Sequence, residues 1–333
     1  MNKIIRTALA ALSKYDVDLK NQYEAKRRKE RRFNPYYKKF GCNQMERIIR
    51  FPDREILTRC FSRDGKIAPL MIFFHGGGFV TGDFDSYNNV CAHLAQRTGY
   101  KVISVDYRLA PEYRFPSGVE DCYAVTQEIL RHSEDWYQAK AEDIILIGDS
   151  AGATLAFMTS IIARDRAGVM PKRQILIYPS ALGDYRGYGE MKKWAYSEKT
   201  PFQSVFENGT DYLLTVKKLN DYMELYASGE EDYRHPYFAP LNNTDFSGMP
   251  ETLLVTMEFD PLRDEGRALG KCLKDGGCDI KTVMIRNGIH GMFSLPPTTP
   301  LTAQIYRHIQ NFLPTEKDEM TDGFEPKKQL EET

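Results

Sequence analysis

The chain has 333 residues, 42% of them hydrophobic, which is enough to bury the core of one large α/β domain. Its 45 basic and 46 acidic residues give a formal net charge of -1, so no overall charge excess favours nucleic acid as a partner. The six cysteines form no CxxC pair, which argues against a zinc site or a disulfide framework and indicates a reducing, cytoplasmic compartment. No stretch approaches the ~20 apolar residues that a membrane span requires.

The N-terminal part of the chain is strongly basic. Residues 1–50 carry 14 Lys and Arg against 5 Asp and Glu, centred on "KRRKERR" at 26–32. We predict that this run is a solvated helix face, with binding of an anionic polymer as the alternative. The first residues, "MNKIIRTALAALSKYD", begin like a signal peptide, but Arg6 and Thr7 interrupt the apolar stretch. They predict an amphipathic helix.

Short apolar runs then alternate with stretches of helical spacing, which is typical of a mostly parallel sheet with helices on both faces. The segments "ERIIR" and "EILTRCF", near residues 46–61, predict two alternating edge strands at an antiparallel start to this sheet. The remaining predicted strands are residues 69–74, 101–105, 144–148, 174–178, 252–257 and 280–285.

Two segments do not fit this alternation. More than seventy residues without a clear strand separate Tyr178 from Thr252, which predicts an inserted structure. Residues 181–240 hold eight of the twenty tyrosines, and such aromatic residues either pack a core or line a ligand pocket. The tail, residues 315–333, is charged and is predicted to be disordered.

The strongest chemical motif is "GDSAG", which lies between a predicted strand and a helical run. In this context GxSxG forms a tight turn that exposes a nucleophilic serine, here Ser150, near the positive end of a helix. A plain helix-capping serine is the alternative.

A serine nucleophile needs a base and a third group to orient it. Asp260 and His290 each follow directly after a predicted strand, and the carboxyl ends of the strands are where an open α/β sheet places its site. The order Ser150, Asp260, His290 is that of an α/β-hydrolase. Glu258 and Asp264 are weaker candidates for the acid, because Glu258 is still in the strand and Asp264 lies in the next helix.

The other histidines are better explained by surface, packing or motif positions. His93, His132 and His308 fall in helical stretches, His235 falls in the insertion, and His75 belongs to "HGGGF".

"HGGGF", residues 75–79, places three glycines after a strand. Attack on a carbonyl creates an oxyanion, and backbone N–H donors that meet this charge stabilise it by ~3 to 4 kcal/mol each. In GxSxG hydrolases one donor is the amide after the nucleophile, here Ala151, and the others come from an HGGG-type loop. A glycine-rich turn with no catalytic role is the alternative.

Together "HGGGF", "DYRLAPE" (106–112), "GDSAG", "DPLRDE" (260–265) and "HGMF" resemble the hormone-sensitive lipase family of α/β-hydrolases, in its bacterial carboxylesterase branch. The resemblance spans residues 69–293 and implies an α/β-hydrolase fold. It also implies a triad of Ser150, Asp260 and His290, with the amides of Gly77, Gly78 and Ala151 as oxyanion donors. Arg108 and Glu112 of "DYRLAPE" are expected to fix loops beneath the site.

The resemblance also implies a domain organisation. Residues 1–45 and 181–240 would form a helical cap, and residues 46–180 and 241–314 the hydrolase core. Related enzymes often dimerise, although no exposed apolar segment here requires a homodimer. The family's histidine is often followed by Gly-Phe, whereas Met292 intervenes here beside the base, a change that could reshape the pocket.

The sequence thus predicts a serine carboxylesterase that acts on short-chain esters of small alcohols and needs neither a metal nor an organic cofactor. Deacetylation or amide hydrolysis by the same triad, or ligand binding without turnover, are the alternatives.

Overall fold

The computed structural model describes residues 3–14, 18–33, 41–63, 67–189 and 201–314. The tail predicted to be disordered, residues 315–333, lies outside this range. Within it, no helix is both long and apolar enough to cross a membrane.

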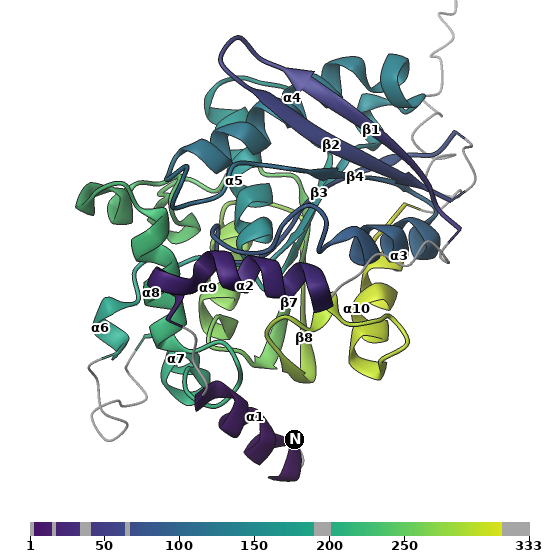
Figure 1. Ribbon diagram of the computed structural model, residues 1–333. Coiled ribbons are helices and arrows are strands. Elements are labelled where there is room, and N and C mark those ends of the chain that lie inside the picture. Colours follow the sequence, from purple (N-terminus) through teal and green to yellow (C-terminus); the bar gives the residue numbers. More distant parts are fainter. Residues whose placement is uncertain (1–2, 15–17, 34–40, 64–66, 190–200, 315–333) are drawn as a thin grey trace, which may run out of the picture.

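The centre of the molecule is one eight-stranded sheet with the strand order β1-β2-β4-β3-β5-β6-β7-β8 (Figure 1). β2 is antiparallel to both of its neighbours, β1 and β4, and the remaining pairs are parallel. The strands are β1 (Asn43–Arg50), β2 (Glu55–Ser62), β3 (Leu70–Phe74), β4 (Lys101–Val105), β5 (Ile145–Asp149), β6 (Arg173–Ile177), β7 (Glu251–Phe259) and β8 (Ile280–Ile289).

All eight predicted strands are present, with one correction. β2 was expected at an edge, but it pairs with β4 as well as with β1, so only β1 and β8 are edges. The alternation of buried and more exposed side chains in β2 reflects one partly exposed face of the sheet. It does not indicate whether the strand lies at the edge of the sheet. The central strands β3, β4 and β5 are buried throughout, as their continuous apolar runs predicted.

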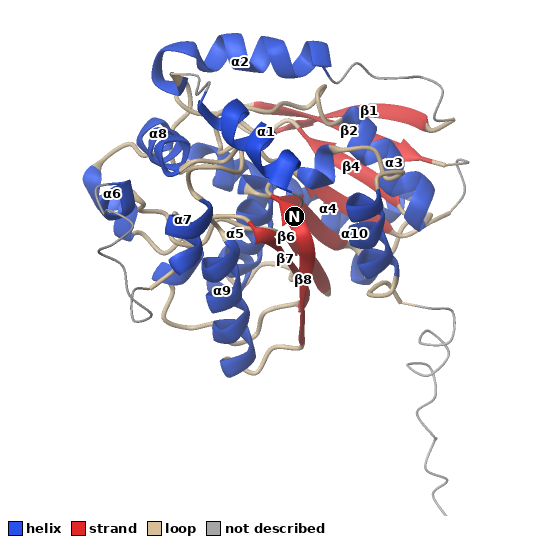
Figure 2. Ribbon diagram, turned by 90° about the horizontal axis from the view of Figure 1, so that it is seen from below, coloured by secondary structure: helices blue, strands red, loops and turns tan. Residues whose placement is uncertain are grey.

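Helices cover both faces of the sheet (Figure 2). One face is covered by α3 (Asn88–Thr98) and α10 (Pro300–Gln310) over one apolar core. The other face is covered by α4 (Ser117–Tyr137), α5 (Ala151–Asp165) and α9 (Arg263–Asp275) over a second core. Two short 3₁₀ helices, η2 (Ala141–Asp143) and η6 (Met292–Ser294), lie in the connections.

The predicted insertion contains helices and no strand among its described residues. Together with the N-terminal helices, it makes up two segments, residues 3–33 and 181–240, which we call the cap segments after the cap that the family resemblance implies. Helices α2 and α8 of the two segments pack against each other (Figure 1). The cap helices are α1 (Lys3–Lys14), α2 (Leu19–Phe33), α6 (Arg186–Gly189), α7 (Gln203–Asn208), α8 (Val216–Tyr226) and η4 (Glu230–Arg234), followed by η5 (Pro240–Asn242).

The basic run of α2 is solvated on one side, as predicted, where Arg28, Lys29 and Arg32 are exposed, and its other side contacts the rest of the protein. Arg28 is exposed, but Arg27 donates to the carbonyl oxygens of Val80 and Ala110, each at 2.7 Å, and pairs with Glu112 at 2.8 Å. Arg31 pairs with Asp83. Arg27 and Arg31, one turn apart on the same side of α2, therefore hold this helix against the loops after β3 and β4.

Candidate active site

The four predicted motifs lie at the carboxyl ends of four parallel strands. The glycine loop follows β3, Ser150 follows β5, Asp260 follows β7 and His290 follows β8. Because these strands run in the same direction, all four motifs meet at one edge of the sheet.

Ser150 occupies a strained turn between β5 and α5. Its backbone φ is 55°, and its N–H donates to the Ile177 carbonyl oxygen at 2.9 Å. A Cβ atom on Gly148 would lie 2.3 Å from the backbone of Gly152, and one on Gly152 would lie 2.0 Å from the Phe74 oxygen. The turn therefore requires both glycines of GxSxG, and it presents the serine side chain at the strand end.

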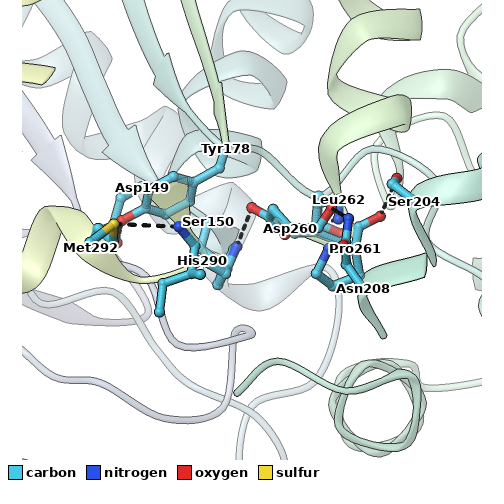
Figure 3. A network of polar contacts seen from close by, with 12 residues as sticks. Asp149, Ser150, Tyr178, Ser204, Asn208, Asp260, Pro261, Leu262, His290 and Met292 are labelled. Carbon is cyan, nitrogen blue, oxygen red and sulfur yellow. Dashed lines mark hydrogen bonds and ion pairs between the residues drawn. The ribbon is translucent and has the colours of Figure 1, made fainter. Parts of the chain in front are cut away.

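Ser150, His290 and Asp260 are hydrogen-bonded in a line (Figure 3). The Ser150 Oγ lies 2.8 Å from His290 Nε2, and His290 Nδ1 lies 2.8 Å from Asp260 Oδ2. The contact with a carboxylate assigns the imidazole proton to Nδ1, which leaves Nε2 to accept from the serine hydroxyl.

The surroundings of Asp260 distinguish it from the two rival acids. Its carboxylate is buried, and Oδ1 accepts from the Leu262 N–H at 2.9 Å. Glu258 accepts from the Asn287 N–H, and Asp264 from the Ser204 N–H and Arg263. Only Asp260, of these three, contacts His290.

Asp149, which the sequence analysis treated only as the variable residue of GxSxG, is a buried acid beside the nucleophile. It accepts from the Gly76 N–H at 3.0 Å and from the hydroxyls of Tyr87 and Tyr178 at 3.2 and 3.3 Å. Burial raises its pKa to about 6. Asp149 thus ties the serine turn to the glycine loop, a role that no sequence pattern indicated.

The glycine loop is shaped by close packing. Gly77 and Gly78 have φ values of 124° and 62°, and a Cβ on Gly78 would lie 2.4 Å from the Tyr222 ring. His75 is buried, its ring stacks on Tyr107 with centroids 4.4 Å apart, and burial lowers its pKa to about 4. His75 therefore packs inside the loop to whose motif it belongs.

The glycine loop, the serine turn and His290 line one cavity of about 310 Å³. Its wall includes Gly77, Gly78, Ala151, Ser150 and His290, so the residues of the predicted oxyanion donors and the reactive side chains border the same space. The cap segments contribute three kinds of side chain to its lining: apolar Leu213, Leu214, Leu219 and Met223, aromatic Tyr222, and charged Lys26, Glu30 and Lys218.

The charged lining could not be predicted from the sequence, because it depends on how the cap segments fold. Of the aromatic side chains described in residues 181–240, Tyr222 lines the cavity, whereas others, such as Tyr226 and Phe238, pack together in the core. Met292 is not among the described lining residues, and its sulfur instead accepts from the Ile289 N–H at 3.4 Å.

No group of three or more His, Cys, Asp or Glu side chains in the described part of the chain is arranged to hold a metal ion.

The fold and this line of side chains define an α/β-hydrolase. Residues 71–294 match a protein family described as having the alpha/beta hydrolase fold. The chain belongs to this family, and its resemblance to the hormone-sensitive lipase branch is confirmed.

Proteins similar in sequence carry esterase names. The carboxylic ester hydrolase LipN of Mycobacterium tuberculosis is 32% identical over 250 residues, which cover 73% of this chain and 62% of LipN. An ethyl acetate hydrolase of Pseudomonas putida is 31% identical over 66% of this chain and 64% of its own length. The alignments thus span less than two thirds of both relatives.

A solved structure, that of a hyperthermophilic esterase from Pyrobaculum calidifontis, has a TM-score of 0.82 at 29% identity. It covers 96% of this chain and 99% of its own, so the likeness extends over the cap segments as well as the core.

Proposed function

We propose that the protein is a serine carboxylesterase that hydrolyses short-chain acyl esters of small alcohols. The observation that carries this proposal is the hydrogen-bonded line of Ser150, His290 and Asp260, of which Ser150 and His290 line a cavity. We assign Ser150 as nucleophile, His290 as general base and acid, and Asp260 as the group that orients the imidazole.

In the first half of the reaction, the Ser150 Oγ attacks the ester carbonyl carbon while its proton passes to His290 Nε2. The carbonyl oxygen becomes an oxyanion, which the amides of Gly77, Gly78 and Ala151 would stabilise. The intermediate collapses when His290 returns the proton to the leaving alcohol, and an acyl-enzyme remains. Asp260 stabilises the imidazolium that forms in between.

In the second half, water enters the position of the alcohol and gives a proton to His290 while its oxygen attacks the acyl carbon. Collapse releases the carboxylic acid and restores the Ser150 hydroxyl. Every proton is carried by His290, so the reaction as proposed needs no group beyond those in the cavity.

The size of the cavity supports short acyl chains. Its volume of about 310 Å³ is at the low end for a small-molecule site, and leucines and Met223 of the cap segments limit it. The name of the Pseudomonas putida relative, an ethyl acetate hydrolase, points to the same class of substrate. We therefore propose that residues 1–45 and 181–240 act as a substrate-selecting cap.

We also propose a cytoplasmic location. All six cysteines are within the described residues and all are unpaired, which suits a reducing compartment.

The test is hydrolysis of p-nitrophenyl esters from acetate to palmitate by the wild-type protein and by Ser150→Ala. We expect the highest kcat/KM for the short acyl chains and loss of turnover in the variant. Faster turnover of the long chains would contradict the proposed substrate class. A folded wild type that turns over none of them would contradict the esterase proposal and favour an amide or sugar-acetate substrate, or a receptor.

A further inference from the structure

Two cap helices are joined to the glycine loop by a continuous chain of hydrogen bonds. Lys26 Nζ of α2 lies 2.7 Å from the Tyr222 hydroxyl of α8. That hydroxyl lies 3.2 Å from Thr81 Oγ1, which donates to the Gly77 carbonyl oxygen at 3.1 Å. All four residues line the cavity that contains Ser150.

The direction of each hydrogen bond is fixed by its ends. An ammonium group only donates, and a carbonyl oxygen only accepts. Thr81 has one hydroxyl proton, which goes to Gly77, so the Tyr222 hydroxyl must donate to Thr81 and accept from Lys26. Every donor therefore points from the lysine towards the peptide, the arrangement in which successive hydrogen bonds strengthen one another.

Lys26 places a positive charge at the start of this chain. Burial disfavours the charged form of its ammonium, but Tyr222 and Glu30 outweigh this effect and hold the pKa above its ordinary value. Glu30 lies 3.3 Å from Nζ, farther than the Tyr222 hydroxyl at 2.7 Å, and also accepts from the Gly82 N–H. The carboxylate thus keeps the lysine in place and anchors the same loop.

The chain of hydrogen bonds ends at the peptide group that joins Gly77 to Gly78. Its carbonyl oxygen also accepts from the N–H groups of Val80 and Thr81, at 3.2 and 2.7 Å. Because a peptide unit is planar and usually trans, the Gly78 N–H points away from the atoms that hold this oxygen. Electron density drawn towards the carbonyl oxygen makes that N–H a stronger donor.

We propose that Lys26, Tyr222 and Thr81 are positioning residues of the oxyanion site, which hold and polarise the Gly77–Gly78 peptide so that its N–H stabilises the transition state. This inference rests on the proposed function, in which the Gly78 N–H is an oxyanion donor. On this account the cap segments complete the catalytic machinery in addition to shaping the pocket.

Two conservative substitutions each remove one hydroxyl group of this series of hydrogen bonds and preserve the packing of the side chain. Tyr222→Phe keeps the ring that covers Gly78, and Thr81→Val keeps the shape of the threonine. With p-nitrophenyl acetate we expect each to lower kcat about tenfold with little change in KM, a fraction of the 10²- to 10³-fold loss for removal of a whole oxyanion donor. Thr81→Ser, which retains the hydroxyl that Thr81→Val removes, should have a kcat near that of the wild type.

The double variant Tyr222→Phe/Thr81→Val separates a connected chain from two independent contacts. If the residues act in series, the kcat of the double variant equals that of the slower single variant. If their effects are independent, the two fold-losses in kcat multiply.

Lys26→Met is compared with Lys20→Met. Lys20 also joins α2 to α8, through Glu224, but is half-exposed on the outside. We expect Lys26→Met to lower kcat and Lys20→Met to leave it near the wild-type value. Equal losses would mean that docking of α2, not polarisation of the peptide, is what matters.

A trifluoromethyl ketone supplies a readout that a purely structural role would not move, because it forms a serine hemiketal whose oxyanion occupies the proposed site. Its inhibition constant should rise by the same factor by which kcat falls in each variant. Unchanged kcat and inhibition constants in Tyr222→Phe and Thr81→Val would overturn the inference while leaving the proposed function intact. A wild type without esterase activity would overturn both.

Discussion

Asp260 accepts hydrogen bonds on both carboxylate oxygens, one from His290 and one from the Leu262 N–H. An amide in its place has only one acceptor oxygen, so one of these two donors would face an NH₂ group. If that donor is His290, the imidazole takes the wrong tautomer and Nε2 can no longer accept the serine proton.

We therefore predict that Asp260→Asn lowers kcat by about 10⁴-fold, with the fold retained. Steady-state kinetics with p-nitrophenyl acetate measures the loss. Glu258→Gln is the control, because the one hydrogen bond described for the Glu258 carboxylate is from the backbone N–H of Asn287, so the variant should have activity near that of the wild type. Equal losses in the two variants would contradict the assignment of the acid.

Glu265 is a second buried acid near the site. Its carboxylate accepts from the Tyr185 hydroxyl and the Leu182 N–H, both at 2.8 Å, and so holds the start of the insertion against α9. Burial, with the nearby charge of Asp260, raises its pKa from 4.5 to about 8.

Because this pKa is higher in the folded than in the unfolded chain, the folded state binds the proton more tightly. Its contribution to stability is present below about pH 4.5 and is lost as the pH rises towards 8. We predict that the free energy of unfolding of the wild type falls by about 3 kcal/mol more than that of Glu265→Gln between about pH 6 and about pH 9. Urea denaturation at both pH values measures this, and parallel changes in the two proteins would contradict it.

Helix α2 is the element whose placement matters most for the site. It provides Lys26 to the cavity wall, while Arg27 and Arg31 attach it to the loop after β3. Adjacent arginines of the same helix thus have different surroundings, since Arg27 is largely buried and Arg28 is exposed.

This contrast gives a matched pair of variants. We predict that Arg27→Met lowers the free energy of unfolding by about 2 kcal/mol, because it leaves two carbonyl groups and Glu112 without their charged donor. Hydrogen exchange of the loop at residues 76–83 should increase as well. Arg28→Met should change stability by less than about 0.5 kcal/mol. Similar effects of the two substitutions would show that α2 is not anchored by Arg27.

At the scale of the whole molecule, the features that could be predicted from the sequence are those set by short segments: the strands and the residues that directly follow them. Ser150, Asp260 and His290 could be assigned because each lies directly after a strand whose apolar run is recognisable, and parallel strands bring their carboxyl ends together. The fold class and the family are confirmed, whereas the roles of the triad and of the amides of Gly77, Gly78 and Ala151 stay predictions.

Contacts between distant segments could not be predicted. Lys26 and Tyr222 are separated by 196 positions, and both belong to cap segments without a recognisable pattern. Asp149 was missed for a different reason: GxSxG leaves its position free, and only the fold shows that Gly76, Tyr87 and Tyr178 converge on it. The edge position predicted for β2 was wrong because alternation reports exposure of a face and not the number of paired neighbours.

The central claim is that Ser150 forms an acyl-enzyme in a cavity completed by the cap segments. The most direct test is rapid acid quenching of the wild type and Ser150→Ala after mixing with p-nitrophenyl acetate, followed by mass spectrometry of the protein and its peptides. The account predicts one acetyl group per wild-type chain, located on Ser150, and none on the variant. Turnover of the ester with an acetyl group on another residue, or equal turnover by Ser150→Ala, would contradict it.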